Sequence, residues 1–316
     1  MSMSDPTHIG FSRREALKTS MLAAGSLFAT GKVAAESKPD EKPEIGIATF
    51  GFGRLSNAEL ARELADAGIG TIQLFLSQTD SHYWRWNGRN DISSMTAERS
   101  KAIADIYRDA GIRIHSIGVY TNLIHPDAEE RKANMDYFEA MMEVANHMDV
   151  HTLITEAGHH KPAQPQPIEF HYQEDVWHRM VATGKELAEL AGKHDKVVLF
   201  EPFYRGFLAT AKRTRLYLEA IGSPRIRALL DPANLLEHND IQEMFDQLGP
   251  QIDCLHAKDR KLHTDRGVAA GEGDVDYHEF VRLAAGRTPH APFIIEYVGP
   301  ENYRQALAHL KGIIMK

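Results

Sequence analysis

Short, mostly apolar runs alternate with longer, more polar stretches from residue 44 to the end of the chain. An apolar run followed by a turn is typical of a strand buried on both faces, as in a parallel sheet. The pattern predicts strands at 45–50, 71–76, 112–118, 151–156, 197–201, 226–231, 252–256 and 293–297. The stretches between these runs are long enough for helices, so strands and helices are expected to alternate.

Signals for helix ends support this alternation. Three pairs have capping-box spacing at helix starts: Ser56 with Glu59, Asn239 with Gln242, and Asp276 with Glu279. Three glycines stand where helices are expected to end: Gly68, Gly111 and Gly222. Eight strands alternating with helices favour an α/β fold, a single-domain (β/α)8 TIM barrel over residues 44–316, rather than an open doubly wound sheet.

Four of the predicted strands each end in a residue that can bind a metal. The runs ending at Phe200, Leu230, Leu255 and Ile295 are followed by Glu201, Asp231, His256 and Glu296. In a parallel barrel the C-terminal ends of the strands meet at one face, where catalytic groups lie. The sequence therefore predicts that these four side chains bind one divalent metal ion.

The predicted ligand set also indicates which metal is preferred. Three carboxylates and one imidazole are mostly hard oxygen donors, which favours Mn²⁺, with Mg²⁺, Co²⁺ or Zn²⁺ as alternatives. A structural zinc site is not expected, because the chain has a single cysteine, Cys254. That cysteine lies inside an apolar run, so we predict a small buried hydrophobic residue rather than a nucleophile. The net charge of −8, with no basic block after the N-terminus, argues against a nucleic-acid partner.

The first 35 residues have the composition of a cleavable export signal. Arg13 and Arg14 precede a weakly apolar stretch at 21–30, which is followed by the small residues Ala34 and Ala35. This resembles a twin-arginine signal, with Ala16 where a large apolar residue is usual. We therefore expect a transient interaction with the twin-arginine translocase and a periplasmic or otherwise exported protein. Residues 36–43 are predicted to be a linker, and the alternative for the first segment is a disordered basic tail.

The apolar part of this signal is too short to span a bilayer, so no stable membrane anchor is expected. Two connections after strands are unusually long, at 77–95 and 157–172. Long loops on the catalytic face of a barrel often form binding walls. The first contains Trp84 and Trp86, which either stack on a sugar ring or fix the loop to the barrel rim. The second contains His159, either a substrate contact or a surface histidine.

Several motifs together resemble the xylose-isomerase-like TIM-barrel superfamily, and in it the sugar epimerases and isomerases similar to tagatose 3-epimerase and hydroxypyruvate isomerase. The motifs are Phe200-Glu201-Pro202, Leu230-Asp231-Pro232-Ala233-Asn234-Leu235, His256-Ala257-Lys258-Asp259, Gly271-Glu272-Gly273-Asp274-Val275-Asp276 and Ile295-Glu296. The resemblance implies a metal held by Glu201, Asp231, His256 and Glu296, with Glu201 and Glu296 also acting as the catalytic proton-transfer pair. The resemblance also implies that Glu156 contacts a substrate hydroxyl.

Three further residues near these motifs are candidates for substrate binding. Lys258 and Arg260 follow His256, where they meet either the substrate or the nearby acidic residues Glu272 and Asp259. Asn234 stands where many ketose epimerases of this kind have a histidine, a departure that argues against a free ketose as substrate. The glycines of the 271–274 segment are too sparse for a phosphate-binding loop and predict a turn.

The predicted chemistry is proton transfer next to a carbonyl. A metal that binds a substrate carbonyl and the adjacent hydroxyl stabilises an enediolate, and a carboxylate on each side moves the proton. We therefore expect a metal-dependent isomerase or epimerase of a small keto-sugar or hydroxy-ketone, and the sequence leaves open whether the protein is a monomer or a homodimer. The alternative is a lyase or dehydratase acting on an oxidised sugar, glycoside or cyclitol. More remote alternatives are an endonuclease and a non-catalytic sugar binder.

Overall fold

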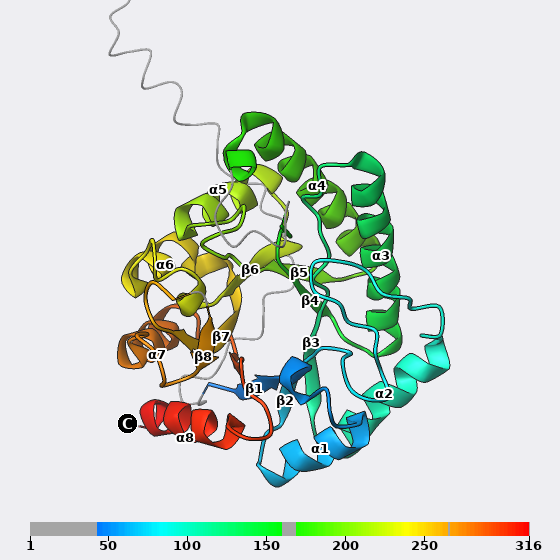
Figure 1. Ribbon diagram of the computed structural model, residues 1–316, viewed down its shortest axis with the longest axis vertical. Coiled ribbons are helices and arrows are strands. Elements are labelled where there is room, and N and C mark those ends of the chain that lie inside the picture. Colours follow the sequence, from blue (N-terminus) through cyan, green and yellow to red (C-terminus); the bar gives the residue numbers. More distant parts are fainter. Residues whose placement is uncertain (1–42, 160–168, 265, 316) are drawn as a thin grey trace, which may run out of the picture. The chain divides into compact units, whose positions relative to one another are not determined.

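The computed structural model (Figure 1) describes residues 43–159, 169–264 and 266–315. All of these residues belong to one structural unit, Ser37–Lys316. The predicted export signal and all but the last residue of the predicted linker lie outside the described residues.

Eight parallel strands close into a barrel (Figure 1). They are β1 (Ile45–Ala48), β2 (Thr71–Leu74), β3 (Arg113–Gly118), β4 (Thr152–Thr155), β5 (Val197–Phe200), β6 (Ile226–Leu230), β7 (Ile252–Arg260) and β9 (Phe293–Ile295). Each strand pairs with the next, and β9 closes the ring by pairing with β1. The predicted TIM barrel is confirmed, and each of the eight predicted strands overlaps an observed one.

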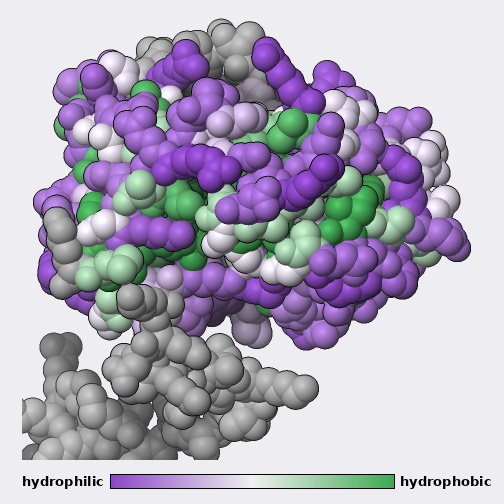
Figure 2. All heavy atoms as spheres, turned by 90° about the horizontal axis from the view of Figure 1, so that it is seen from below, coloured by the Kyte–Doolittle hydropathy of each residue, from purple (hydrophilic) through white to green (hydrophobic). Residues whose placement is uncertain are grey.

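A ring of helices surrounds the barrel (Figure 1). They are α1 (Asn57–Asp66), α2 (Ala97–Asp109), α3 (Ala128–His147), α4 (Glu174–Lys193), α5 (Ala211–Ile221), α6 (Ile241–Leu248), α7 (Tyr277–Arg287) and α8 (Tyr303–Ile314). Each helix buries one side against the barrel or its neighbours, and the surface seen in Figure 2 is mostly hydrophilic with smaller hydrophobic areas. Within the described residues, no helix has the length and apolarity needed to cross a membrane.

The capping predictions for the helices are mostly confirmed. Ser56 and Glu59 form a complete capping box at α1. Asp276 accepts a hydrogen bond from the backbone of Glu279 at α7. The three predicted glycines all have positive φ at helix ends: Gly68 (70°), Gly111 (77°) and Gly222 (70°).

The prediction for the start of α6 is wrong by one residue. Asp240, not Asn239, is the N-cap, and its carboxylate accepts from the backbone N–H of Glu243. The side chain of Asn239 instead bridges two elements, since its Oδ1 accepts from the backbone of Ala211 at 3.0 Å. Asn239 and Asp240 are both suited to the N-cap position of α6. Because the Asn239 side chain binds the start of α5, Asp240 becomes the N-cap.

Alternate residues of the strands fill the barrel interior. These inward residues form a cluster of their own, separate from the core between barrel and helices: Ala48, Phe75, Tyr120, Ile154, Leu199, Leu229, Cys254 and Ile294. Cys254 is a buried free cysteine, as predicted, and burial raises the pKa of its thiol. Successive side chains in a strand face opposite sides, so the residue two positions after an inward residue also faces inward.

The strand β7 is longer than the predicted run and leads into a small hairpin. It continues to Arg260 and pairs antiparallel with β8 (Gly267–Ala269). The segment 271–274 forms the predicted turn between β8 and α7, and the carboxylate of Asp259 accepts backbone hydrogen bonds from Gly271 and Val275. This hairpin explains why polar residues follow His256 in a continuous strand.

Candidate metal centre

The four predicted ligands meet inside the barrel. Glu201, Asp231 and Glu296 directly follow β5, β6 and β9, and His256 lies within β7. One candidate ligand atom from each of Glu201, Asp231, His256 and Glu296 lies within 4.8 Å of the others. Nδ1 of His256 lies 3.4 Å from Glu201 Oε1 and 3.6 Å from Glu296 Oε2. Each ligand stands two positions after an inward-facing residue (Leu199, Leu229, Cys254 or Ile294), so the strand alternation directs all four toward the same space.

The polar atoms of this cluster fit a divalent cation. Among the described residues, Oδ1 of Asp231 and Nδ1 of His256 are buried without a hydrogen-bond partner, whereas Oδ2 of Asp231 and Oε2 of Glu296 form ion pairs with Lys258. Leaving such atoms unsatisfied costs about 1–3 kcal/mol each, more for charged groups, and metal coordination removes that cost. Three carboxylates and an imidazole are donors suited to Mn²⁺ or Mg²⁺ and compatible with Co²⁺ or Zn²⁺.

Lys258 contributes a buried positive charge to the site. Its Nζ lies 2.7 Å from Asp231 Oδ2 and 3.2 Å from Glu296 Oε2, and it donates a hydrogen bond to Asn234 Oδ1 at 2.9 Å. Its neighbouring carboxylates raise the pKa of the ammonium despite burial, so Lys258 stays charged. Three carboxylates and one ammonium leave a charge of −2 when the histidine is neutral, which one divalent cation balances.

Three polar side chains orient the candidate ligands through hydrogen bonds. Gln73 Oε1 lies 2.6 Å from His256 Nε2. Tyr120 donates its hydroxyl hydrogen to Glu201 Oε2 at 2.7 Å, and the Asn234 amide donates to Glu201 Oε1 at 2.7 Å. Hydrogen bonds of this kind fix the orientation of metal ligands and tune their basicity.

The ligands differ in proton affinity without a metal. Burial alone raises carboxyl pKa values, and it does so for Asp231 and Glu296. At Glu201 the burial effect is outweighed by His256 and by hydrogen bonds, which lower the pKa to about 2. Burial opposes protonation of His256, but Glu296 and Glu201 outweigh it and raise its pKa to about 9. A proton on Nδ1 must leave before this atom binds a cation, so low pH opposes metal binding.

A cavity of about 370 Å³ lies over the cluster. Of the four ligands, only Glu201 and Glu296 line it, whereas Asp231 and His256 are fully buried beneath. The predicted substrate-binding residues that line it are Trp84, Trp86, Glu156, His159, Asn234 and Lys258. A substrate in this cavity therefore meets the two predicted catalytic glutamates.

The two tryptophans occupy different environments. Trp84 packs among Phe75, at 5.2 Å between ring centroids, and Tyr120, at 6.4 Å, which fixes the loop to the barrel interior. Trp86 is 44% exposed and lies 5.2 Å from the His159 ring. Of the two, Trp86 presents more free surface for stacking against a ligand.

Glu156 and His159 form a pair on the wall of the cavity. Oε2 of Glu156 lies 3.0 Å from Nε2 of His159. The backbone of His159 is held by two amide side chains, with its N–H donating to Asn87 Oδ1 at 2.8 Å and its carbonyl accepting from Asn122 at 2.9 Å. This pair offers an acid–base group separate from the ligand glutamates.

Arg260 is not among the residues that line this cavity. Its guanidinium stacks on the ring of Tyr204, 4.2 Å from the centroid, and Nη1 lies 3.4 Å from Glu237. The predicted partners Glu272 and Asp259 are replaced by Glu237, although Asp259 accepts from the backbone N–H of Arg260.

Several residues of the site were missed from the sequence. Gln73 and Tyr120 contact ligands directly, and the aromatic residues Phe50, Phe75, Phe203 and Tyr297 line the cavity. Gln73 is a polar residue inside an apolar strand, and this irregularity is the signal that could have identified it. Tyr297 follows Glu296 with φ of 58°, a backbone region that is uncommon for a bulky residue.

The fold agrees with a sequence comparison. Residues 61–313 match the family described as "Xylose isomerase-like TIM barrel", so the chain belongs to that family. No curated protein is similar enough in sequence to count as a match.

Solved structures with the same fold include three with named activities. D-psicose 3-epimerase from Clostridium cellulolyticum is 15% identical with a TM-score of 0.66, covering 86% of this chain and 99% of that one. The 3-keto-D-glucoside 4-epimerase from E. coli is 14% identical with a TM-score of 0.67, covering 86% and 100%. A probable 3-DHS dehydratase from Bacillus anthracis is 18% identical with a TM-score of 0.68, covering 86% and 99%. At these identities the similarity supports the fold alone.

Proposed function

We propose that this protein is a divalent-metal-dependent isomerase or epimerase that acts on a keto-sugar or hydroxy-ketone. The observation that carries this proposal is the pair of cavity-lining carboxylates, Glu201 and Glu296, which lie 3.4 Å and 3.6 Å from Nδ1 of His256. They come from β5 and β9, which two other strands separate in the barrel. The pair can therefore reach a bound substrate from different sides. The epimerase activities named for two structures with this fold are consistent with it.

The mechanism requires two proton-transfer groups and a stabilised negative charge. A divalent cation held by Glu201, Asp231, His256 and Glu296 would polarise a substrate carbonyl and its neighbouring hydroxyl. One glutamate then removes the proton from the carbon beside the carbonyl, and the other returns a proton to the opposite face.

The test is deuterium incorporation from D₂O, followed by NMR. Protein from Glu36 onward, with Mn²⁺ or with EDTA, is incubated with ketoses, keto-glycosides, inosose and hydroxypyruvate. Metal-dependent exchange beside the carbonyl is expected, and Glu296→Gln should slow it by about 10²–10⁴-fold. Glu186→Gln, on the exposed side of α4, is the control. Absence of exchange with every substrate despite bound metal would refute the proposal.

A second candidate is a metal-dependent lyase or dehydratase. The Glu156–His159 pair favours it, because a group apart from the two glutamates could protonate a departing oxygen. A dehydratase is also among the solved structures with this fold. Elimination leaves an unsaturated product, whereas epimerisation does not, so NMR of the products distinguishes the two reactions.

We also propose that the protein is exported by the twin-arginine translocase and acts in the periplasm. Arg13 and Arg14, the apolar stretch at 21–30 and the small residues at 34–35 support this proposal. Fractionation of cells that produce the full chain, with Arg13→Lys and Arg14→Lys introduced together, tests it. The unaltered chain is expected in the periplasmic fraction, and the variant in the cytoplasm.

A further inference from the structure

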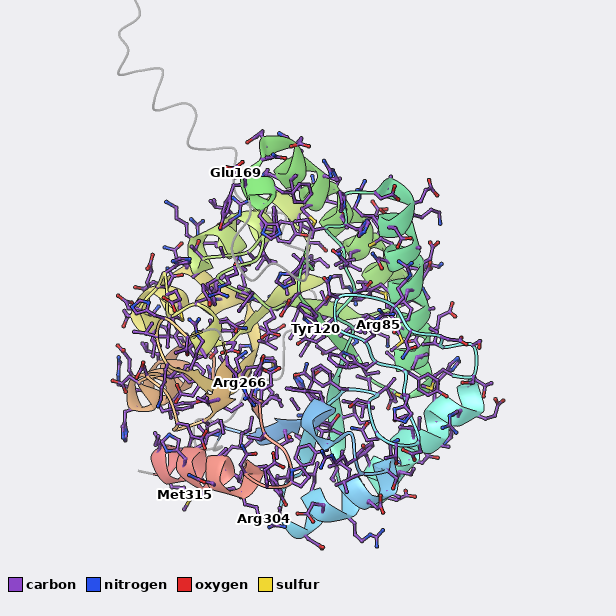
Figure 3. All side chains as sticks on the ribbon, in the orientation of Figure 1. Arg85, Tyr120, Glu169, Arg266, Arg304 and Met315 are labelled. Carbon is purple, nitrogen blue, oxygen red and sulfur yellow. The ribbon has the colours of Figure 1, made fainter. Side chains whose placement is uncertain are left out.

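A second cavity adjoins the one over the metal centre. It has a volume of about 510 Å³ and is lined by Arg85, Trp86, Asn87, Gly88, Arg89, Asn122, His125, Glu130 and Asn134. Most of these residues belong to the loops after β2 and β3, and the others to the start of α3. The second cavity therefore lies on the catalytic face of the barrel. Arg85 and Tyr120 are labelled in Figure 3, and a backbone hydrogen bond joins the two loops that carry them, since Gly88 donates to the Tyr120 carbonyl at 3.3 Å.

Trp86 and His159 separate the two cavities. Trp86 lines both of them, with its ring 5.2 Å from that of His159. Asn87 and Asn122 line the second cavity and hold the backbone of His159, which lines the first. A ligand that extends past Trp86 therefore passes directly from one cavity into the other.

The side chains of the second cavity are suited to binding hydroxyl groups. Arg89 is already engaged by Glu130 at 2.9 Å and Asn134 at 2.7 Å. In the described part of the chain, Arg85 has no hydrogen-bond or ion-pair partner. The Nδ1 atom of His125 accepts from the backbone of Asp127, while its Nε2 atom has no hydrogen-bond partner among the residues that the structure describes. Polar groups beside an exposed aromatic ring allow a sugar ring to stack on one face and hydrogen-bond at its edge.

We propose that the second cavity is a binding site for a second sugar residue. The substrate is then a disaccharide or longer glycoside, whose reacting ring lies over the metal centre and whose linked ring lies beyond Trp86. Arg85 and His125 bind hydroxyls of the linked ring. The assignment of the reacting ring rests on the proposed function, whereas the preference for a linked second ring is a property of binding alone.

Calorimetry with sugars that lack a ketone tests this preference without turnover. The probes are glucose and its disaccharides maltose, cellobiose and trehalose, added to the metal-loaded protein. At least one disaccharide is expected to bind about tenfold or more tightly than glucose, which is about 1.4 kcal/mol. Arg85→Ala and His125→Ala should each reduce this preference severalfold. Arg62→Ala, an exposed arginine on α1, is the matched control and should retain the full preference.

Two results would overturn the proposal. One is that no disaccharide binds more tightly than glucose, including the case in which none binds. The other is a preference that persists undiminished in both Arg85→Ala and His125→Ala. Failure of deuterium exchange together with a disaccharide preference removes the proposed reaction and supports the second site. Deuterium exchange with free ketoses, without a preference for disaccharides, supports the proposed reaction and removes the second sugar site.

Discussion

The side-chain oxygen of Gln73 lies 2.6 Å from Nε2 of His256 in the barrel interior. An amide oxygen only accepts hydrogen bonds, so Nε2 carries the hydrogen, and Nδ1 of the neutral ring presents its lone pair. Nδ1 is also the atom that faces Glu201 and Glu296. Gln73 therefore holds the imidazole in the orientation and tautomer that a metal ligand requires.

Replacement of Gln73 by methionine should weaken metal binding while the barrel stays folded. Methionine has a similar shape but lacks the amide oxygen, so the ring of His256 loses its fixed orientation. The affinity for Mn²⁺, measured by competition with a chelating dye, is expected to fall about 10–100-fold. Gln305→Met, at an exposed position of α8, is the control and should leave the affinity unchanged. Equal affinities for the two variants would show that Gln73 has no such role.

Replacement of Lys258 by methionine should destabilise the metal-free protein more than the metal-bound protein. Lys258 is the buried cation beside Asp231 and Glu296, and removing one partner of a buried ion pair typically costs about 3–5 kcal/mol. Saturating Mn²⁺ is expected to reduce this loss, because the added cation offsets the same carboxylates. Denaturant unfolding in EDTA and in Mn²⁺ measures both values, with the exposed Lys261→Met as control. An equal loss of unfolding free energy in EDTA and in Mn²⁺ would contradict the idea that Lys258 and the metal offset the same carboxylates.

A charge cluster at the other end of β7 should make stability depend on pH. Asp253 is bound by Arg227, with Nη2 to Oδ1 at 2.7 Å, and by His290 at 3.2 Å. Burial opposes ionisation of Asp253, but the hydrogen bonds from His290 and Arg227 outweigh it and lower its pKa. The hydrogen bond to Asp253 raises the pKa of His290.

The directions of the two pKa shifts define the pH range in which the Asp253–His290 contact contributes most to stability. The Asp253 contribution is complete above the ordinary Asp pKa of about 3.9 and is lost as pH falls through the lowered value. The His290 contribution is complete below the ordinary His pKa of about 6.5 and is lost as pH rises through the raised value. Asp253→Asn should therefore reduce the free energy of unfolding most between about pH 4 and 6.5, by roughly 1–3 kcal/mol.

Unfolding of Asp253→Asn and the unaltered protein across pH 2–9 measures this effect. Asp246→Asn removes the exposed ion pair with Arg287 and is the control, with an expected loss below about 1 kcal/mol. If the loss of unfolding free energy in Asp253→Asn does not vary with pH, the titration of Asp253 and His290 is not coupled to stability. The rate of deuterium exchange per folded molecule should not change, because Asp253 lies at the N-terminal end of its strand.

Replacement of His159 by glutamine should distinguish the two proposed reactions. In the epimerase, protons move through Glu201 and Glu296, so exchange should slow by less than about tenfold, against 10²–10⁴-fold for Glu296→Gln. In the lyase, product formation should fall much more than exchange, because His159 protonates the departing oxygen. NMR of one sample measures both rates. If His159→Gln slows exchange as strongly as Glu296→Gln does, His159 is the base that removes the proton. That result would contradict the roles assigned to His159 in both proposed reactions.

The sequence alone determined the barrel and the four residues of the candidate metal centre. A strand buried on both faces needs a continuous apolar run, so the eight strands were visible along the chain. The first ionisable residue after such a run lies at or near the C-terminal end of the parallel part of its strand, and strand alternation directs it inward when the residue two positions earlier faces inward. Glu201, Asp231, His256 and Glu296 each follow such a run, and the repetition of this pattern on four successive strands indicated the group.

The tertiary structure alone decided which side chains support those ligands. Gln73 and His256 are 183 positions apart, and Tyr120 and Glu201 are 81 apart. Local pattern carries no information on such pairs, because their contact depends on closure of the ring between β9 and β1 and on the register of each strand. The packing of long loops likewise separated Trp84 from Trp86 and created the second cavity. Burial is encoded residue by residue, whereas contacts across the barrel arise only once the whole sheet has closed.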